Sequence, residues 1–207
     1  DEQNPFQKSV FSESKCRLNS GWLMDFGLNL HPDWAIFRDV SPIIGMRYQY
    51  FYFTTHDGYQ VGLDGHSVDL PGDGIDFKQT FYQWYLGGLV STSVNTSGIW
   101  RSLPTATLRL QADYALARAK NEDLHLLRRG ERITRDNTDG HCWHFNAAMA
   151  MDLRHNMKAR FDLDFQRIVT HGDHELSNSF YDIYFSFSGA KVWSDMFSMT
   201  GLIEFSF

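Results

Sequence analysis

The chain has 207 residues and a mass of 24.0 kDa, with 19 basic and 25 acidic residues and a formal net charge of −6. This length suits a single domain, and an acidic chain without a basic stripe argues against a nucleic-acid-binding protein. No run of about 18 apolar residues occurs, which excludes a transmembrane helix, and residues 1–9 lack the apolar core of a signal peptide, so we expect any export signal to have been removed.

The aromatic content is high for a chain with negative mean hydropathy. Phe, Tyr and Trp together make 15% of the residues, while mean hydropathy is −0.38. A transmembrane β-barrel has this combination, because only one face of each strand meets lipid. The two cysteines, Cys16 and Cys142, are too few for a disulfide framework, and we expect both to be structural.

Seven segments alternate between apolar and polar residues with the period of two that predicts half-buried β-strands. The last segment, DMFSMTGLIEFSF, keeps this alternation over residues 195–207, about twice the length of an ordinary strand, and ends on Phe, which is typical of outer-membrane proteins. A soluble β-sandwich is the alternative, and the segment lengths disfavour it. In chain order the segments are residues 22–30, 44–52, 82–90, 108–116, 143–153, 156–169 and 195–207.

The connections between these segments alternate in length. A tight turn is expected at 154–155 and moderate connections at 31–40 and 92–103, whereas 54–75, 119–140 and 170–194 read as long polar loops. Short periplasmic turns and long external loops alternate in this way in transmembrane barrels. We therefore predict an all-β fold, an antiparallel transmembrane β-barrel that forms one domain over residues 1–207.

The strand count predicts that this domain is N-terminally incomplete. With the C-terminus in the periplasm, residues 1–17 fall outside the membrane, as the tail of another long external loop. Single-chain bacterial barrels have even strand numbers and leave no unpaired edge in lipid. We expect about seven strands here of roughly ten, with about three N-terminal strands missing.

Asp123-Leu124-His125 lies at the end of an outward-running strand, in the segment 119–134. Residues two apart in a strand point to the same side, so an Asp here can accept the imidazole N–H and raise the basicity of the other nitrogen. Such a base can take a proton from water. The spacing alone is common, and in an Arg-rich segment the alternative is a solvated ion cluster.

Several segments, in order, resemble the omptin family of outer-membrane endopeptidases. They are FKQTFYQWYLGG (77–88), NEDLH (121–125), GERIT (130–134), GAKVWSDMFSMTGLIEFSF (189–207) and, upstream, IIGMRYQYFYFTTHDG (43–58). The resemblance spans nearly the whole chain, although only the Asp-x-His hairpin is specific. It implies His125 as general base, Asp123 as its orienting partner, water as nucleophile and a peptide bond beside basic residues as target, with neither cofactor nor metal. The implied partners are a peptide or protein substrate and outer-membrane lipid, with lipopolysaccharide as a candidate, and the catalytic rim faces outside in the bacterial outer membrane.

Three departures from the omptin pattern limit this prediction. The family's second acidic pair, Asp-x-Asp, falls before Asp1, and we do not count Asp1 or Glu2 as catalytic. The acidic residue two positions before the catalytic Asp is Asn121 here, although Glu122 or Asp136 could supply charge. The positions of the family's lipid A contacts hold other residues, so dependence on lipopolysaccharide is not carried over. These positions are Met46, Tyr48, Tyr50 and Thr80.

Other polar clusters are better explained by structural roles than by binding or catalysis. In His141-Cys142-Trp143-His144 alternate side chains point apart, so an interfacial aromatic girdle is a better account than a metal site. The segment 171–174 is likewise a weak metal candidate. Mixed charges on the lumen face favour a packed salt-bridge network over an open channel; they are Arg109, Asp113, Lys158, Arg160, Asp162 and Asp164. The functional alternatives are a non-enzymatic adhesin or invasin, acting through long external loops, and a small solute channel.

Overall fold

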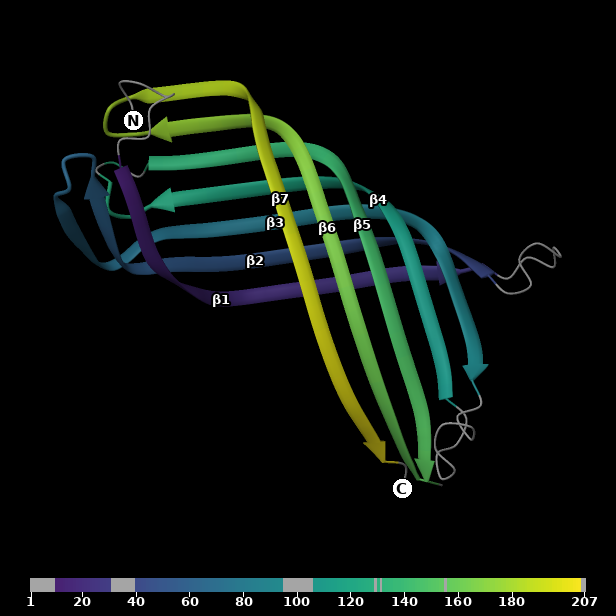
Figure 1. Ribbon diagram of the computed structural model, residues 1–207. Helices are drawn as coiled ribbons and strands as arrows, with labels where there is room; N and C mark the ends of the chain where they lie inside the picture. The colour runs from purple at the N-terminus through teal and green to yellow at the C-terminus, as the bar shows by residue number, and fades with distance from the viewer. Residues whose placement is uncertain are drawn as a thin grey trace.

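The computed structural model describes residues 10–30, 40–94, 106–128, 130, 132–154 and 156–205, which form one antiparallel sheet (Figure 1). Its strands follow chain order, each paired with its sequence neighbours, and β1 and β7 form the two edges of a sheet that is not closed. The prediction of an all-β antiparallel fold is confirmed. No helix in the described part of the chain is long and apolar enough to cross a membrane. The strands are β1 Val10–Asn29, β2 Val40–Gly62, β3 Ser67–Val94, β4 Ala106–His125, β5 Arg132–Arg154, β6 Met157–Asn178 and β7 Ile183–Phe205.

The strands are longer than the sequence pattern predicted, with 20 to 28 residues each. Most of the three predicted long loops, 54–75, 119–140 and 170–194, is paired strand, and short turns such as 63–66 and 179–182 connect the strands. That prediction was wrong because these segments lack a strict apolar–polar alternation, although their backbone pairing continues. The tight turn at 154–155 is confirmed by the pairing of Arg154 with Met157. Residues 10–17, expected in a loop, belong to β1.

The predictions for residues 31–39 and 95–105 lie outside the described residues, as do those for residues 1–9, 206 and 207.

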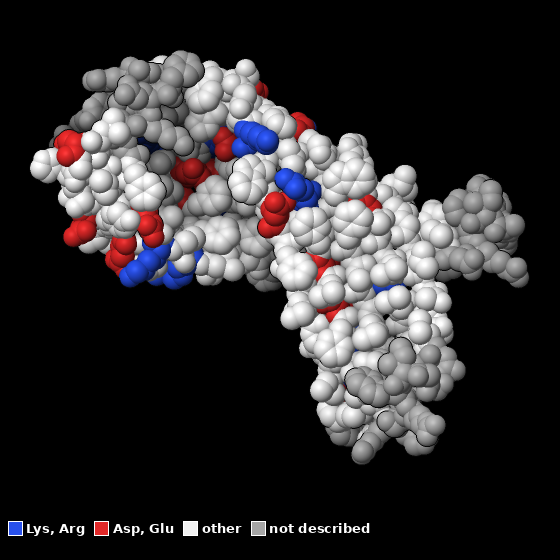
Figure 2. All heavy atoms as spheres, viewed as in Figure 1, with Lys and Arg blue, Asp and Glu red and all other residues white. Residues whose placement is uncertain are grey.

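The two faces of the sheet differ sharply in polarity. On the outer face, large apolar side chains are exposed, and on β7 Phe197 is 70% and Met199 73% exposed. On the inner face, polar side chains such as Arg47, Gln83 and His144 are buried. Figure 2 shows that one arm of the molecule is mostly uncharged on its surface, while charged residues gather toward the other end. A wall with an apolar outside and a polar inside is the pattern of a transmembrane barrel.

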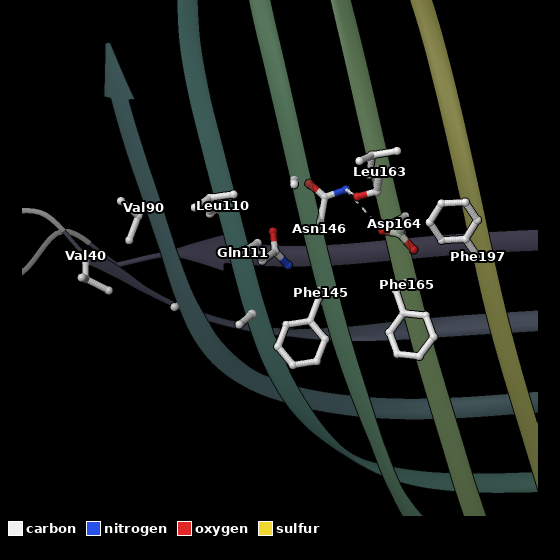
Figure 3. Close-up of a pocket in the computed structure, with 13 residues that line it drawn as sticks. Val40, Val90, Leu110, Gln111, Phe145, Asn146, Leu163, Asp164, Phe165 and Phe197 are labelled. Atoms are coloured by element: carbon white, nitrogen blue, oxygen red, sulfur yellow. Dashed lines mark hydrogen bonds between the residues drawn. The ribbon is translucent and has the colours of Figure 1, made fainter. Parts of the chain in front are cut away.

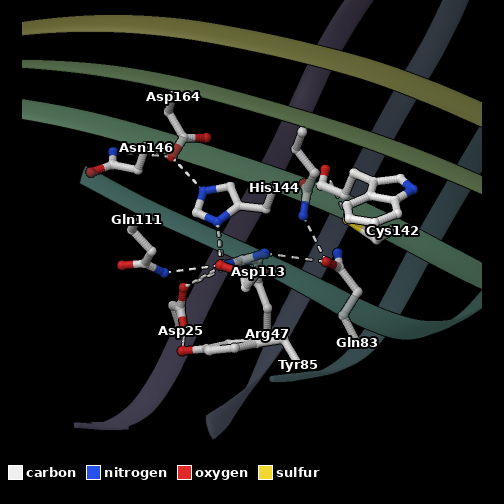
Figure 4. Close-up of polar contacts among 12 residues, drawn as sticks. Asp25, Arg47, Gln83, Tyr85, Gln111, Asp113, Cys142, His144, Asn146 and Asp164 are labelled. Atoms are coloured by element: carbon white, nitrogen blue, oxygen red, sulfur yellow. Dashed lines mark hydrogen bonds and ion pairs between the residues drawn. The ribbon is translucent and has the colours of Figure 1, made fainter. Parts of the chain in front are cut away.

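A network of hydrogen bonds and ion pairs fills the inner face (Figure 4). The His144 ring donates from Nδ1 to Asp113 at 2.6 Å and lies 2.7 Å through Nε2 from Asp164. Arg47 Nε donates to Asp25 at 3.0 Å. A ring of amides continues it, since Gln166 bonds to both Gln49 and Gln83, each at 2.6 Å. Two of the predicted lumen charges, Asp113 and Asp164, thus meet through a histidine.

Two glycines make room for an aromatic ring next to this network. Gly27 and Gly45 lie against the phenol of Tyr85, so that a Cβ at either position would collide with the Tyr85 hydroxyl. That hydroxyl donates to Asp25 at 2.7 Å, and the Arg47 guanidinium carbon lies 4.9 Å from the ring centroid. The small residues therefore let Tyr85 reach the ion pair.

Replacing Gly45 by Ala should destabilise the protein by about 1–3 kcal/mol, because the added methyl collides with the Phe26 carbonyl oxygen and forces Tyr85 away from Asp25. The urea midpoint of the full-length protein in detergent micelles measures this change. Gly201→Ala is the matched control, since its Cβ would meet only the Phe161 ring, at an ordinary 3.7 Å. Equal midpoints for the two variants would contradict the packing role.

Candidate functional site

Asp123 and His125 lie at the C-terminal end of β4, on the inner face of the sheet. The exposed apolar side chains on the outer face of β4 end at Leu116. Further along the strand this face continues with polar residues, beginning with Arg118. His125 follows Leu116 by nine residues, which is about 30 Å along an extended strand. The pair therefore sits at a rim well beyond the apolar band, where water has access.

Asp123 is a partly buried carboxylate with an unusual environment. Thr134, its cross-strand partner on β5, donates its hydroxyl to Oδ2 at 3.2 Å. The other oxygen, Oδ1, is buried and accepts no hydrogen bond from the described residues. Burial and the nearby Asp136 charge raise the pKa of Asp123 to about 6, against the Thr134 bond and His174, which lower it. The group is thus ionised above roughly pH 6, with one oxygen available.

His125 is a neutral imidazole at pH 7. Burial lowers its pKa from the ordinary value, and the charges of Arg132 and Arg128 lower it further. Arg132 is its direct cross-strand partner on β5. No hydrogen bond joins His125 to Asp123 within the described part of the chain, so the two residues share a face but are not connected in this conformation. A neutral imidazole can accept a proton, which is what a general base must do.

A second carboxylate–imidazole pair lies next to Asp123. His174 on β6 donates from Nδ1 to Asp136 on β5 at 2.6 Å, and the His174 ring centroid is 4.8 Å from that of Phe187. Asn121 is only 8% exposed; its Nδ2 donates to Asp136 at 3.3 Å, and its Oδ1 is buried without a partner among the described residues. From the sequence, Asp136 was only a possible source of charge, and 171–174 only a weak metal candidate.

The segment 141–144 divides between the two faces as its alternation predicts. His144 is buried in the inner network, while His141 stacks on Tyr114 and Trp143 contacts Tyr114 edge-on, at centroid distances of 5.9 and 4.8 Å. Cys142 is buried and Cys16 exposed, and both are free thiols. Among the described residues no group of three or more His, Cys, Asp or Glu side chains could hold a metal ion.

A cavity in the described part of the chain lies away from the rim. It has a volume of about 520 Å³ and lies among strand segments that carry the apolar band (Figure 3). Its walls include Phe145, Phe165 and Phe197 from three successive strands, with the Asn146–Asp164 hydrogen bond of 3.3 Å at one side. It holds no unpaired acid or base, so the candidate catalytic site is the rim.

Long antiparallel strands with an apolar outer face and a buried polar inner face define the wall of an outer-membrane type of β-barrel. No protein-family model matches the sequence, and no curated protein matches it. A solved structure is similar over the whole chain: the crystal structure of the outer membrane protease OmpT from Escherichia coli, with a TM-score of 0.76 and 16% identity. The match covers 100% of this chain and 71% of that one. The omptin resemblance is therefore confirmed at the level of the fold.

Proposed function

We propose that this protein is an outer-membrane endopeptidase that cleaves peptides near basic residues, with its catalytic rim outside the cell. The observation that carries the proposal is the position of Asp123 and His125: both face inward at the polar end of a wall whose fold is that of an outer membrane protease. No cofactor enters the proposed reaction.

In the proposed mechanism water is the nucleophile. The neutral imidazole of His125 takes a proton from water as that water attacks the peptide carbonyl carbon, and later returns a proton to the leaving amine. Asp123, ionised above roughly pH 6, accepts the imidazole N–H through its open Oδ1 after a side-chain rotation. This bond fixes the ring and stabilises the imidazolium that forms.

The acceptors around Asp123 support a cationic group in the substrate. Asn121 Oδ1 is a buried acceptor without a donor in the described structure, and the Asp136 carboxylate lies beside it. Buried acceptors favour a ligand that brings only donors, and guanidinium and ammonium groups have no acceptor. This arrangement offsets the loss of the acidic residue that the omptin pattern has at the position of Asn121.

The proposal includes closure of the barrel by further strands, about ten in all. Among the described residues the edges β1 and β7 carry no partner strand, and unpaired backbone groups in lipid cost several kcal/mol each. The acidic pair that the omptin resemblance places across the groove also falls outside this sequence. Any test of activity therefore uses the full-length natural protein.

The first test is cleavage of a quenched fluorescent peptide with a dibasic centre by intact bacteria that express this protein. We expect the wild type to cleave, and His125→Ala at equal surface expression to lose about 10²- to 10⁴-fold in rate, the usual contribution of a general base. A peptide whose two basic residues are replaced by citrulline is the substrate control, because it removes the charge and keeps the shape. Equal rates for wild type and variant would refute the assignment.

A non-enzymatic adhesin is the second candidate, and exposed aromatic residues at the outer end of β7 favour it. Tyr184, Phe185 and Phe187 on β7 and Tyr181 in the turn before it are each more than half exposed, although Tyr184 lies on the face opposite Phe185 and Phe187. Exposed aromatic side chains outside the apolar band are typical of a protein-binding surface. Attachment of cells that His125→Ala leaves unchanged, together with a wild type inert toward the peptide, would support this alternative.

A further inference from the structure

We infer that Asp136 and His174 are positioning residues of the proposed site: this second carboxylate–imidazole pair, joined across β5 and β6 next to Asp123, tunes the charge on Asp123 that His125 requires. The inference rests on the proposed function of Asp123 and His125, and it goes beyond that function by assigning its pH response to two further residues.

The geometry places the three groups in one row across three strands. Thr134 is the direct partner of Asp123 and Asn121 that of Asp136, so Asp136 is the diagonal neighbour of Asp123 on the inner face. Diagonal neighbours of this kind have Cα atoms about 7–8 Å apart. His174 stands directly opposite Asp136 on β6 and is joined to it by the 2.6 Å hydrogen bond. The order across the wall is therefore carboxylate, carboxylate, imidazole.

The two members of the second pair shift the pKa of Asp123 in opposite directions. The negative charge of Asp136 raises the pKa of Asp123, and the charge of His174 lowers it. A positive charge on His174, 2.6 Å from Asp136, offsets the repulsion between the two carboxylates. Without that charge, the Asp136 carboxylate is uncompensated and favours a proton on Asp123.

Few other charges face this row. Arg132 on β5 and Arg128 in the turn between β4 and β5 lie toward His125, which is on the same strand as Asp123. On β3 the residues opposite Asp123 and Asn121 are uncharged, Phe77 and Gln79.

Charged residues next to the row in sequence point to the other face. Glu122 lies on the outer face with Arg135 at 2.9 Å and Lys78 at 3.4 Å, and Asp173 and Glu175 alternate away from His174 along β6. Asp136 and His174 thus remain as the two groups that tune Asp123 from across the sheet.

The test is the pH profile of kcat for the full-length protein, measured at saturating dibasic peptide between pH 4.5 and 8. For wild type we expect activity to fall below about pH 6, where Asp123 gains a proton. Asp136→Asn should move this acid limb, the fall of kcat at low pH, to lower pH. The substitution removes the negative charge of Asp136, which raises the pKa of Asp123. His174→Gln should move the limb to higher pH, because it removes the compensating cation. Each shift should be about half a pH unit or more.

Controls separate this tuning from a structural role. Asp139→Asn removes an exposed carboxylate of β5 that pairs with Arg118 on the outer face, and it should leave the limb in place. The double variant Asp136→Asn/His174→Gln should bring the limb back toward the wild-type position, because both charges are gone. Folding of every variant is checked by heat-modifiable mobility in gel electrophoresis.

Failure of this inference and failure of the proposed function give different results. Unshifted limbs, or limbs shifted in one direction by both single variants, would overturn the inference while leaving the protease assignment intact. A wild type that never cleaves the peptide would instead remove the proposed function on which the inference rests.

Discussion

Asp123→Asn is expected to lower kcat about 10²- to 10⁴-fold, because the amide keeps the size of the carboxylate but loses its charge. The variant can still accept the Thr134 hydroxyl bond, seen here at 3.2 Å, so the local fold should survive. What it loses is a negative acceptor that holds the His125 ring in one tautomer and stabilises it once protonated. The measurement is kcat on the quenched dibasic peptide with the full-length protein in micelles.

The matched control for this variant is Glu122→Gln, one residue away on the opposite face. Glu122 is engaged with Arg135 and Lys78 on the outside of the wall, and its substitution removes the same charge from the same strand. We expect less than about a twofold change, since exposed ion pairs contribute little. An Asp123→Asn variant as active as Glu122→Gln would contradict the role of Asp123.

The sequence predicts the lower part of the wall well because lipid imposes a rule there. A strand that crosses the apolar band must present an apolar side chain at every second position, as β6 does with Phe161, Leu163 and Phe165. Above the band both faces meet water or polar neighbours, so strand residues such as His56 and Asp57 carry no such signature. The upper halves of the strands were therefore taken for loops, although their backbone pairing continues.

The candidate site divides along a similar line. Asp123 and His125 are two residues apart in one strand, and their common side follows from local geometry alone. Asp136 and His174 are 38 residues apart, and their contact depends on the register between β5 and β6. That register includes a shift between Asp152 and Arg154, and a further slip of one residue would send one of the two side chains to the outer face. The second pair therefore emerges only from the three-dimensional arrangement.

Arg47 shows the same dependence on register in the inner network. In the sequence it is a single Arg between Met46 and Tyr48, within an aromatic strand. In the folded sheet it is buried and reaches Asp25 on β1 at 3.0 Å and Asp113 on β4 at 3.6 Å. The strands that supply these carboxylates lie on opposite sides of β2, and β3 separates β2 from β4. Curvature of the sheet, which alternation does not encode, brings them together.

Arg47→Ala is expected to destabilise the folded protein by about 3–5 kcal/mol, the usual cost of removing one partner from a buried ion pair. Without the guanidinium, the Asp25 and Asp113 carboxylates keep only His144, Gln111 and Tyr85 as donors among the described residues. Asp113 Oδ1 already lacks a hydrogen-bond partner among the described residues, so a further lost contact leaves this carboxylate less well satisfied. The urea midpoint of the full-length protein in micelles, followed by Trp fluorescence, measures the loss.

Two further substitutions show whether charge or shape at Arg47 matters more. Arg118→Ala removes an exposed Arg that is paired with Asp139 at 2.7 Å, and it should leave the midpoint unchanged because water replaces the lost contact. Arg47→Lys retains the charge but replaces the planar fork that contacts Asp25 through both Nε and Nη2. We expect its midpoint to fall between those of wild type and Arg47→Ala. If Arg47→Ala unfolded at the same urea concentration as Arg118→Ala, the inner network would be filling rather than a source of stability, and the curvature of the wall would have to come from the aromatic packing around Tyr85 instead.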